Sequence, residues 1–184
     1  MKRYPNITDS QQGAKSDRGF SLIELLIVVA IILIIAAIAI PNMLKSRMAA
    51  NQASAVSNLR TITSASVSYS VTFSNGYPPN LAALGGVEGA AASCTASILI
   101  DPVLASTLQK SGYQFAYTGE QGNVTNTTCA SPGYNGYLVT AVPITAGITG
   151  NLSFCVTEPG ILHYDPMGQV AGSETACEAL PILQ

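Results

Sequence analysis

An unbroken apolar stretch from Phe20 to Ile40 constrains this 184-residue chain more than any other feature of its sequence. Its residues are mostly Ile, Leu, Val and Ala, and Glu24 is its single charged side chain. Twenty-one helical residues rise about 31 Å, and the hydrocarbon core of a bilayer is roughly 30 Å thick. The stretch is therefore predicted to be a membrane-crossing helix, and any globular domain has to be built from the residues that follow it.

The charges on either side of this stretch favour one orientation. Residues 1–19 carry four basic and two acidic side chains, whereas the remainder carries four basic and eight acidic ones, 4 − 8 = −4. A basic head favours a cytoplasmic N-terminus and an exported body, although Lys45 and Arg47 beyond the stretch make the bias modest. A basic head on a mildly acidic body is not the pattern of a nucleic-acid-binding protein, and no direct nucleic-acid binding is predicted.

Two simpler interpretations of the stretch are a secretory signal and a plain membrane anchor. A secretory signal has an apolar core of about 7–15 residues before a small-residue cleavage site, which Ala37-Ile38-Ala39 could imitate. The stretch is longer than such a core, and Pro41 follows closely. A plain single-pass anchor fits the length but leaves Glu24 unexplained, since a carboxylate in lipid costs up to about 3 kcal/mol unless it reaches the headgroups.

The residues around Glu24 carry a specific resemblance. The segment GFSLIELLIVVAII (residues 19–32) resembles, almost residue for residue, the N-terminal signature of the type IV pilin and pseudopilin family. The resemblance implies that a prepilin peptidase cuts between Gly19 and Phe20 on the cytoplasmic side and then methylates the new amino group of Phe20. It also implies that the apolar helix remains in the mature protein.

The resemblance assigns roles in assembly to two further residues. In the family, the carboxylate at the position of Glu24 meets the terminal ammonium of a neighbouring subunit. Because an unpaired buried charge costs several kcal/mol, such a pair would fix the axial register of each subunit. Pro41 removes one helical hydrogen bond and clashes with the carbonyl of Ala37, which by itself indicates a kink at the membrane exit. The resemblance adds that the helix just before this proline can unwind in a filament.

Beyond Pro41 the helix is predicted to continue to about Phe73, where Ser74-Asn75-Gly76 stops it. Apolar or small residues recur mostly three or four positions apart and should pack on a sheet: Met48, Ala55, Leu59, Ile62, Ser66, Tyr69 and Phe73. The other faces of the helix should carry polar residues: Asn51, Ser57, Arg60, Ser64 and Ser68.

The remaining residues are predicted to form a small antiparallel sheet. A short helical turn over 81–84, capped by Asn80, and a second short helix from Pro102 to about Lys110 precede it. Strands are expected over 113–117, 137–142, 152–157 and 161–164, with Pro159-Gly160 at the centre of a type II turn. The expected fold is α+β, pilin-like, with a long N-terminal helix packed on the sheet. The expected divisions are a cleaved leader (1–19), a transmembrane or filament-core half-helix (20–40), an amphipathic half-helix (41–74) and an exported β-rich domain (75–184).

Four cysteines, Cys94, Cys129, Cys155 and Cys177, lie in the part expected to be exported. Without a C-x-x-C pair and with one histidine, a zinc site is not expected, and disulfides are favoured in one of three connectivities. We favour Cys94–Cys129 and Cys155–Cys177. The second pair would close a loop like the disulfide-bounded one near many pilin C-termini. If Cys94 lay beside Cys155 instead, both assignments would be wrong.

No catalytic or metal-binding constellation is predicted, and an enzyme is the least supported class. His163 lacks an accompanying nucleophile motif and is expected to be structural. The stretch Asp165-Pro166-Met167-Gly168 faintly resembles the calcium-binding region of major pseudopilins. Calcium needs six to eight oxygen ligands, however, and only Glu158 and Glu174 are other carboxylates nearby, so no metal or cofactor is expected.

The resulting hypothesis is a structural subunit, the precursor of a type IV pilin. It implies insertion in the inner membrane with a cytoplasmic N-terminus, and then polymerisation with other copies into an extracellular filament. The implied partners are a prepilin peptidase and a pilus assembly platform. A pseudopilin of a type II secretion system is the first alternative, which a calcium site would favour and the two C-terminal cysteines disfavour. A membrane-tethered binding module is the second, and it predicts neither a filament nor a dependence on Glu24.

Overall fold

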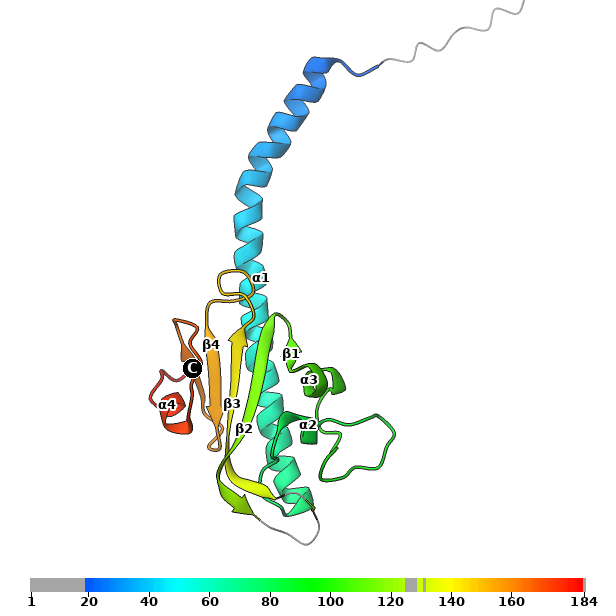
Figure 1. The fold of residues 1–184 in the computed structure, drawn as a ribbon. Helices are drawn as coiled ribbons and strands as arrows, with labels where there is room; N and C mark the ends of the chain where they lie inside the picture. Colours follow the sequence, from blue (N-terminus) through cyan, green and yellow to red (C-terminus); the bar gives the residue numbers. More distant parts are fainter. Residues whose placement is uncertain (1–18, 125–128, 131, 184) are drawn as a thin grey trace, which may run out of the picture. The chain divides into compact units, whose positions relative to one another are not determined.

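The computed structural model describes residues 19–124, 129–130 and 132–183, so the leader before Gly19 lies outside the described residues. The chain divides into two compact units, residues 1–41 and residues 42–184. The long helix α1 (Leu22–Phe73) contributes to both, and each unit is described by itself (Figure 1).

The described part of the first unit is the apolar beginning of α1 together with Gly19, Phe20 and Ser21. Every Leu, Ile and Val side chain between positions 22 and 40 is at least 45% exposed. These residues form a helix although many are β-branched, since helix formation satisfies every interior backbone hydrogen bond within the segment. The helical assignment continues through Pro41.

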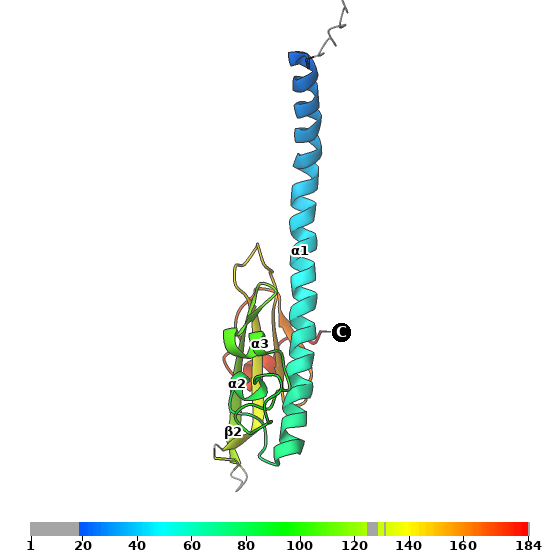
Figure 2. The same ribbon diagram turned by 90° about the vertical axis from the view of Figure 1, so that its right-hand side faces the viewer.

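The second unit packs the rest of α1 on one face of a five-stranded antiparallel sheet with strand order β1-β2-β3-β4-β5 (Figure 2). The strands follow in chain order: β1 (Gln109–Lys110), β2 (Tyr113–Val124), β3 (Gly133–Pro143), β4 (Ser153–Thr157) and β5 (Leu162–Asp165). Consecutive strands pair through short connections, which is the simplest antiparallel topology. The long helix on an antiparallel sheet confirms the predicted α+β fold.

The predicted apolar stripe of α1 forms the core with the inner face of the sheet. Ala55, Leu59, Ile62, Ser66 and Tyr69 are buried, while Met48 and Phe73 are half-buried. The sheet contributes alternate residues of β2, β3 and β4, as the two-residue period of a strand requires: Tyr113, Phe115, Tyr137, Val139, Ala141, Phe154 and Val156. The helix ends at Phe73, where the sequence analysis placed its end.

One residue of the predicted polar face of α1, Asn51, contacts another part of the chain. Asn51 is half-buried, and its Nδ2 donates a hydrogen bond of 2.9 Å to the carbonyl oxygen of Thr149 in the β3–β4 connection. Helical periodicity could not reveal this contact, because it depends on a loop 98 residues further along the chain.

The short helices match the prediction in part. The side chain of Asn80 caps α2 (Leu81–Leu84) by accepting from the backbone N–H of Ala83 at 3.0 Å. Helix α3 (Pro102–Thr107) ends before the predicted Lys110, since Leu108 takes a left-handed conformation and Lys110 pairs with β2 as part of β1. Helix α4 (Glu174–Glu178), capped by Ser173, was not predicted.

The sheet also corrects two strand boundaries and one turn. Strand β2 runs seven residues past the predicted Tyr117 to Val124, and β3 begins at Gly133, because each supplies the backbone partners of the other. In the β4–β5 turn, the N–H of Gly160 donates to the carbonyl of Thr157 at 2.8 Å. Glu158 and Pro159 are therefore the central residues, one position earlier than predicted.

Candidate functional site

Gly19 and Phe20, the expected cleavage position, precede the helix. Neither residue is in regular secondary structure, and the side chain of Phe20 is 89% exposed. Nothing lies within 4 Å of the place where a Cβ on Gly19 would be. A bond between these residues is therefore open to an enzyme, whereas a bond inside a helical turn would first need unwinding.

Glu24 lies in the first turn of α1, where its carboxylate already has a local partner. The backbone N–H of Ser21 donates to Oε2 of Glu24 at 2.9 Å, and the N–H of Leu25 donates to the carbonyl of Ser21. This is the glutamate half of a capping box, in which an acid at the third helical position satisfies a free donor at the helix start. The S-x-x-E spacing from Ser21 to Glu24 is a sequence signal for this contact that the sequence analysis missed.

The apolar side chains between positions 22 and 40 have no partner within the described chain. The most apolar 18-residue window of α1 has a mean hydropathy of 3.3, and none of it is buried. Fully burying one Leu, Ile or Val side chain contributes about 1.5–3 kcal/mol. Over this segment the sum exceeds the roughly 5–15 kcal/mol that stabilises a typical domain. The segment therefore requires lipid or other apolar helices around it.

Pro41 lies in α1 next to the boundary between the two units. Without an N–H it cannot donate to the carbonyl of Ala37, so one hydrogen bond of the helix is missing there. Seventeen positions separate Glu24 from Pro41, about 26 Å along a helix. The structure therefore does not bring the two predicted assembly residues together. They lie near the two ends of the apolar segment of α1 and do not form one pocket.

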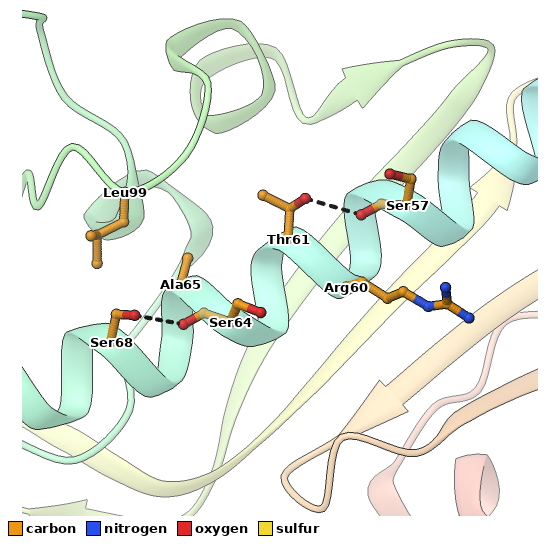
Figure 3. A pocket seen from close by; sticks show the side chains of 7 residues that line it. All are labelled: Ser57, Arg60, Thr61, Ser64, Ala65, Ser68 and Leu99. Carbon is orange, nitrogen blue, oxygen red and sulfur yellow. Dashed lines mark hydrogen bonds between the residues drawn. The ribbon is translucent and has the colours of Figure 1, made fainter.

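In the second unit, part of the exposed side of α1 carries small polar side chains together with Arg60 (Figure 3). It borders a groove of about 410 Å³ lined by Ser57, Arg60, Thr61, Ser64, Ala65, Ser68 and Leu99. The hydroxyl of Thr61 donates to the carbonyl of Ser57 at 3.0 Å, and that of Ser68 donates to Ser64 at 2.9 Å. The hydroxyl groups of Thr61 and Ser68 thus donate to carbonyl groups of their own helix. Small side chains of this kind let another helix approach closely.

Charge is distributed unevenly between α1 and the residues that follow it. No Asp or Glu occurs from Leu25 to Val87, whereas Lys45, Arg47 and Arg60 lie in that range. Among the described residues the one ion pair joins Lys110 to Asp101 at 2.8 Å, and this hydrogen bond is the main cause that lowers the pKa of Asp101. The three basic groups of α1 therefore remain available to acidic partners outside the subunit.

The four cysteines form the pairs Cys94–Cys129 and Cys155–Cys177, the same pairs that we favoured from the sequence. The second bond joins β4 to α4, and both of its cysteines are almost fully buried. The segment after α4 then lies along β5, where the N–H of Leu183 donates to Leu162 and that of Tyr164 donates to Pro181. The disulfide therefore anchors a C-terminal segment that covers an edge of the sheet.

His163 belongs to this C-terminal arrangement. Its side chain is 5% exposed, and Nδ1 lies 2.7 Å from the carbonyl oxygen of Leu180. A carbonyl can only accept, so Nδ1 carries the proton and donates. The imidazole thus ties β5 to the segment after α4, which is a structural role.

Asp165 is engaged by the backbone in the stretch that resembles a calcium site. Its Oδ1 accepts from the N–H of Met167 at 2.8 Å, and its Oδ2 accepts from the N–H of Gln169 at 3.2 Å. Across the described ranges, no three His, Cys, Asp or Glu side chains are grouped so that they could hold a metal ion. The geometry around Asp165 is that of a tight turn.

Tyrosines dominate the buried end of the interface between α1 and the sheet. The rings of Tyr117 and Tyr137 stack with centroids 5.5 Å apart, and Tyr77 meets Tyr137 edge-on at 4.9 Å. Burial raises the pKa of Tyr117, and it raises the pKa of Tyr113 to about 12. These phenols remain protonated at neutral pH, so they serve packing rather than acid–base chemistry.

Comparisons with known proteins agree with this geometry. Residues 14–40 match the prokaryotic N-terminal methylation motif. The type IV major pilin protein PilA of Myxococcus xanthus is 53% identical over 53 residues, which cover 29% of this chain and 24% of that protein. The type IV wide pilus major component PilA4 of Thermus thermophilus is 40% identical over 87 residues, covering 46% of this chain and 66% of that protein.

These matches span less than two thirds of the length of either relative, and no solved structure matches. The methylation motif covers the segment that contains Gly19, Phe20 and Glu24, and the fold beyond it is a long helix on an antiparallel sheet. With two type IV major pilins among the relatives that it matches, the chain is similar to type IV pilins in its methylation motif and N-terminal helix.

Proposed function

We propose that the chain is the precursor of the major structural subunit of a type IV pilus. The observation that carries the proposal is the exposure of every Leu, Ile and Val side chain between positions 22 and 40, each at least 45%. A surface of this kind is stable only in lipid or among apolar helices. Packing copies of the segment side by side would bury it when it leaves the membrane, and that burial would drive polymerisation.

Processing is the first proposed step. A prepilin peptidase cleaves the exposed Gly19–Phe20 bond at the cytoplasmic face and methylates the amino group of Phe20. The leader before it is removed, and the apolar helix remains as the membrane anchor of the subunit. The nonhelical, accessible conformation of Gly19 and Phe20 supports this step.

Assembly is the second step. The new ammonium group of one subunit pairs with the Glu24 carboxylate of a neighbour, so that neither charge is left alone in an apolar core. A subunit inserted at another axial offset would leave both charges unpaired, and this penalty selects the register. The basic groups of α1 and the acidic remainder of the chain favour contact between different copies through opposite charge.

The proposed location follows from the same segment. The unassembled subunit spans the inner membrane once, with its N-terminus in the cytoplasm, and residues 75–184 are exported. An assembly platform then extracts subunits into a filament on the cell surface. Because the helix is soluble in lipid as well as among its copies, the filament can return its subunits to the membrane.

N-terminal sequencing by mass spectrometry of sheared surface filaments tests the proposal. A mature chain that begins with methylated Phe20 and is the main constituent of long fibres is the expected result. A mature chain that begins near Ile40 would instead match a secretory signal, and processing at Phe20 without long fibres would favour a pseudopilin. A membrane-bound chain whose ligand binding persists in fibre-free cells would favour the tethered binding module.

A further inference from the structure

The β3–β4 connection holds an apolar side chain out into solvent near the beginning of the second unit. Ile148 is 61% exposed, although its loop is well ordered by hydrogen bonds from the N–H groups of Ile148 and Thr149 to the carbonyl of Thr145. The contact from Asn51 to Thr149 fastens the loop to α1. A single exposed isoleucine is ordinary, so the neighbours of Ile148 decide whether this loop is part of a contact surface.

Residues of α1 beside this loop also hold apolar side chains exposed to solvent. Arg47 and Ile148 line the same recess of about 330 Å³, together with Asn51 and Thr149. Met43 and Leu44 are 75% and 47% exposed, and they lie four and three positions before Arg47, on its side of the helix. We call Met43, Leu44, Arg47 and Ile148 the proximal surface.

Chain connectivity limits how far the proximal surface can be from the apolar segment. Met43 follows Ile40 by three residues, so its Cα stays within about 11 Å of that of Ile40 however the two units are oriented. Arg47 follows by seven residues and stays within about 25 Å. When residues 20–40 span a bilayer, Met43 is therefore held close to its outer surface, and Arg47 lies within about 25 Å of it.

The chemistry of the proximal surface fits phospholipid headgroups. Arg47 of the proximal surface and Lys45, two positions before it on α1, have no ion pair within the described chain, and no carboxylate occurs between Leu25 and Val87. Apolar side chains beside basic ones are the composition of segments that lie in a membrane interface, where the apolar groups enter the acyl boundary and the cations meet lipid phosphates.

We propose that the proximal surface docks on the anionic headgroup layer of the membrane while the apolar segment spans it. The contact orients the second unit on the membrane and is released when the subunit enters a filament. The proposal rests on the membrane insertion that is part of the proposed function. It adds a lipid-binding surface outside the spanning segment.

The absence of tryptophan from the sequence allows a direct test. Ile148→Trp gives the full chain one fluorescent reporter at the surface, and Val71→Trp gives a matched control. Val71 is 74% exposed and lies 24 positions after Arg47 on α1, about 36 Å along the helix. Each variant is reconstituted in a large excess of vesicles of phosphatidylcholine and phosphatidylglycerol, with brominated acyl chains as quencher.

The expected result is a blue-shifted emission for I148W and at least about twofold stronger quenching by brominated lipid than for V71W. Adding Lys45→Ala and Arg47→Ala should reduce the quenching of I148W, as should replacing phosphatidylglycerol with phosphatidylcholine. Equal quenching at positions 148 and 71 would overturn the proposal. A blue shift without bromine quenching would also overturn it, because a protein neighbour would then cover Ile148.

Flotation of the same samples separates this proposal from the one on which it rests. Vesicles are floated at alkaline pH, where peripheral proteins are released and inserted ones remain bound. A chain that floats without quenching of Trp at 148 contradicts only the docking surface. A chain that does not float contradicts the insertion of residues 20–40 as well.

Discussion

The backbone N–H of Ser21 donates a hydrogen bond of 2.9 Å to Oε2 of Glu24, so the acid of the apolar segment has a partner within its own chain. The contact gives Glu24 a role as a helix cap in addition to its proposed role as an intersubunit charge. A cap needs an acceptor oxygen, whereas a charge pair needs the carboxylate. The two roles can therefore be separated by substitution.

Replacing Glu24 with glutamine should prevent filament growth while leaving the helix intact. The amide of E24Q can still accept from Ser21, but it cannot neutralise a terminal ammonium of a neighbour. We expect cleavage at Gly19 to persist and the yield of sheared filaments to fall by at least about tenfold, as one lost charge-assisted contact of ~1.5–3 kcal/mol implies. Glu24→Ala removes both roles. If E24Q assembles normally while E24A does not, the cap and not the charge supports assembly.

Leu59→Ala should destabilise the second unit strongly. Leu59 is fully buried between α1 and the sheet, and removing its side chain leaves a cavity, which costs about 2–5 kcal/mol. Val71→Ala, on the exposed face of the same helix, is the control and should change stability by less than about 0.5 kcal/mol. Chemical unfolding of the detergent-solubilised chain, followed by circular dichroism, measures both. A similar small loss for the two variants would contradict the packing of α1 on the sheet.

The Cys155–Cys177 bond should contribute more to stability than the Cys94–Cys129 bond. Chain entropy alone would make the Cys94–Cys129 bond slightly more stabilising, because its sequence separation is 35 residues and that of Cys155–Cys177 is 22. Each loop contributes roughly 3–4 kcal/mol on this model. Burial decides the order, since Cys155 and Cys177 are at most 1% exposed and their removal also leaves a cavity beside Leu138.

Paired alanine variants compared by thermal unfolding test this order. In graded reductant, followed by alkylation and mass spectrometry, Cys94 and Cys129 should become modified first, because Cys94 is half-buried and reductant can reach it. Earlier modification of Cys177 would mean that α4 opens readily and does not protect the bond.

Stability should fall above about pH 10 as buried tyrosines ionise. Burial raises the pKa of Tyr113 to about 12, while in the unfolded chain its pKa is near 10. The folded state holds the proton more tightly, so the contribution is complete below about pH 10 and is lost as the pH rises towards 12. Tyrosinate absorbance and unfolding midpoints between pH 8 and 12 measure this. Tyr113→Phe should lower stability at neutral pH, because the bond to Leu152 is lost, and flatten the alkaline decline.

If all the tyrosines of the folded chain ionised together near pH 10, before any unfolding, the burial of these phenols would be contradicted. The aromatic contacts of Tyr117 with Tyr137 would then not persist in solution.

Local sequence determined much of this protein. The apolar run from Phe20 to Ile40 predicted the helix, and the segment 19–32 carried the resemblance to type IV pilins. The three-to-four spacing of Ala55, Leu59 and Ile62 predicted the face of α1 that is buried. Asn80 was recognisable as a cap because a cap depends on residues three positions away. The capping contact between Ser21 and Glu24 was readable by the same rule and was missed.

Tertiary structure decided the features that depend on distant partners. Strand β2 extends to Val124 only because β3 supplies its hydrogen bonds, and Lys110 leaves the predicted helix to pair with Tyr113. Arg47 and Ile148 line one recess with Asn51, whose side chain binds a loop 98 residues away. The hydrophobic period, helix caps and helix-breaking residues act over a few positions, so they can be recognised from the local sequence. Strand pairing and loop docking join groups that only the folded chain brings together.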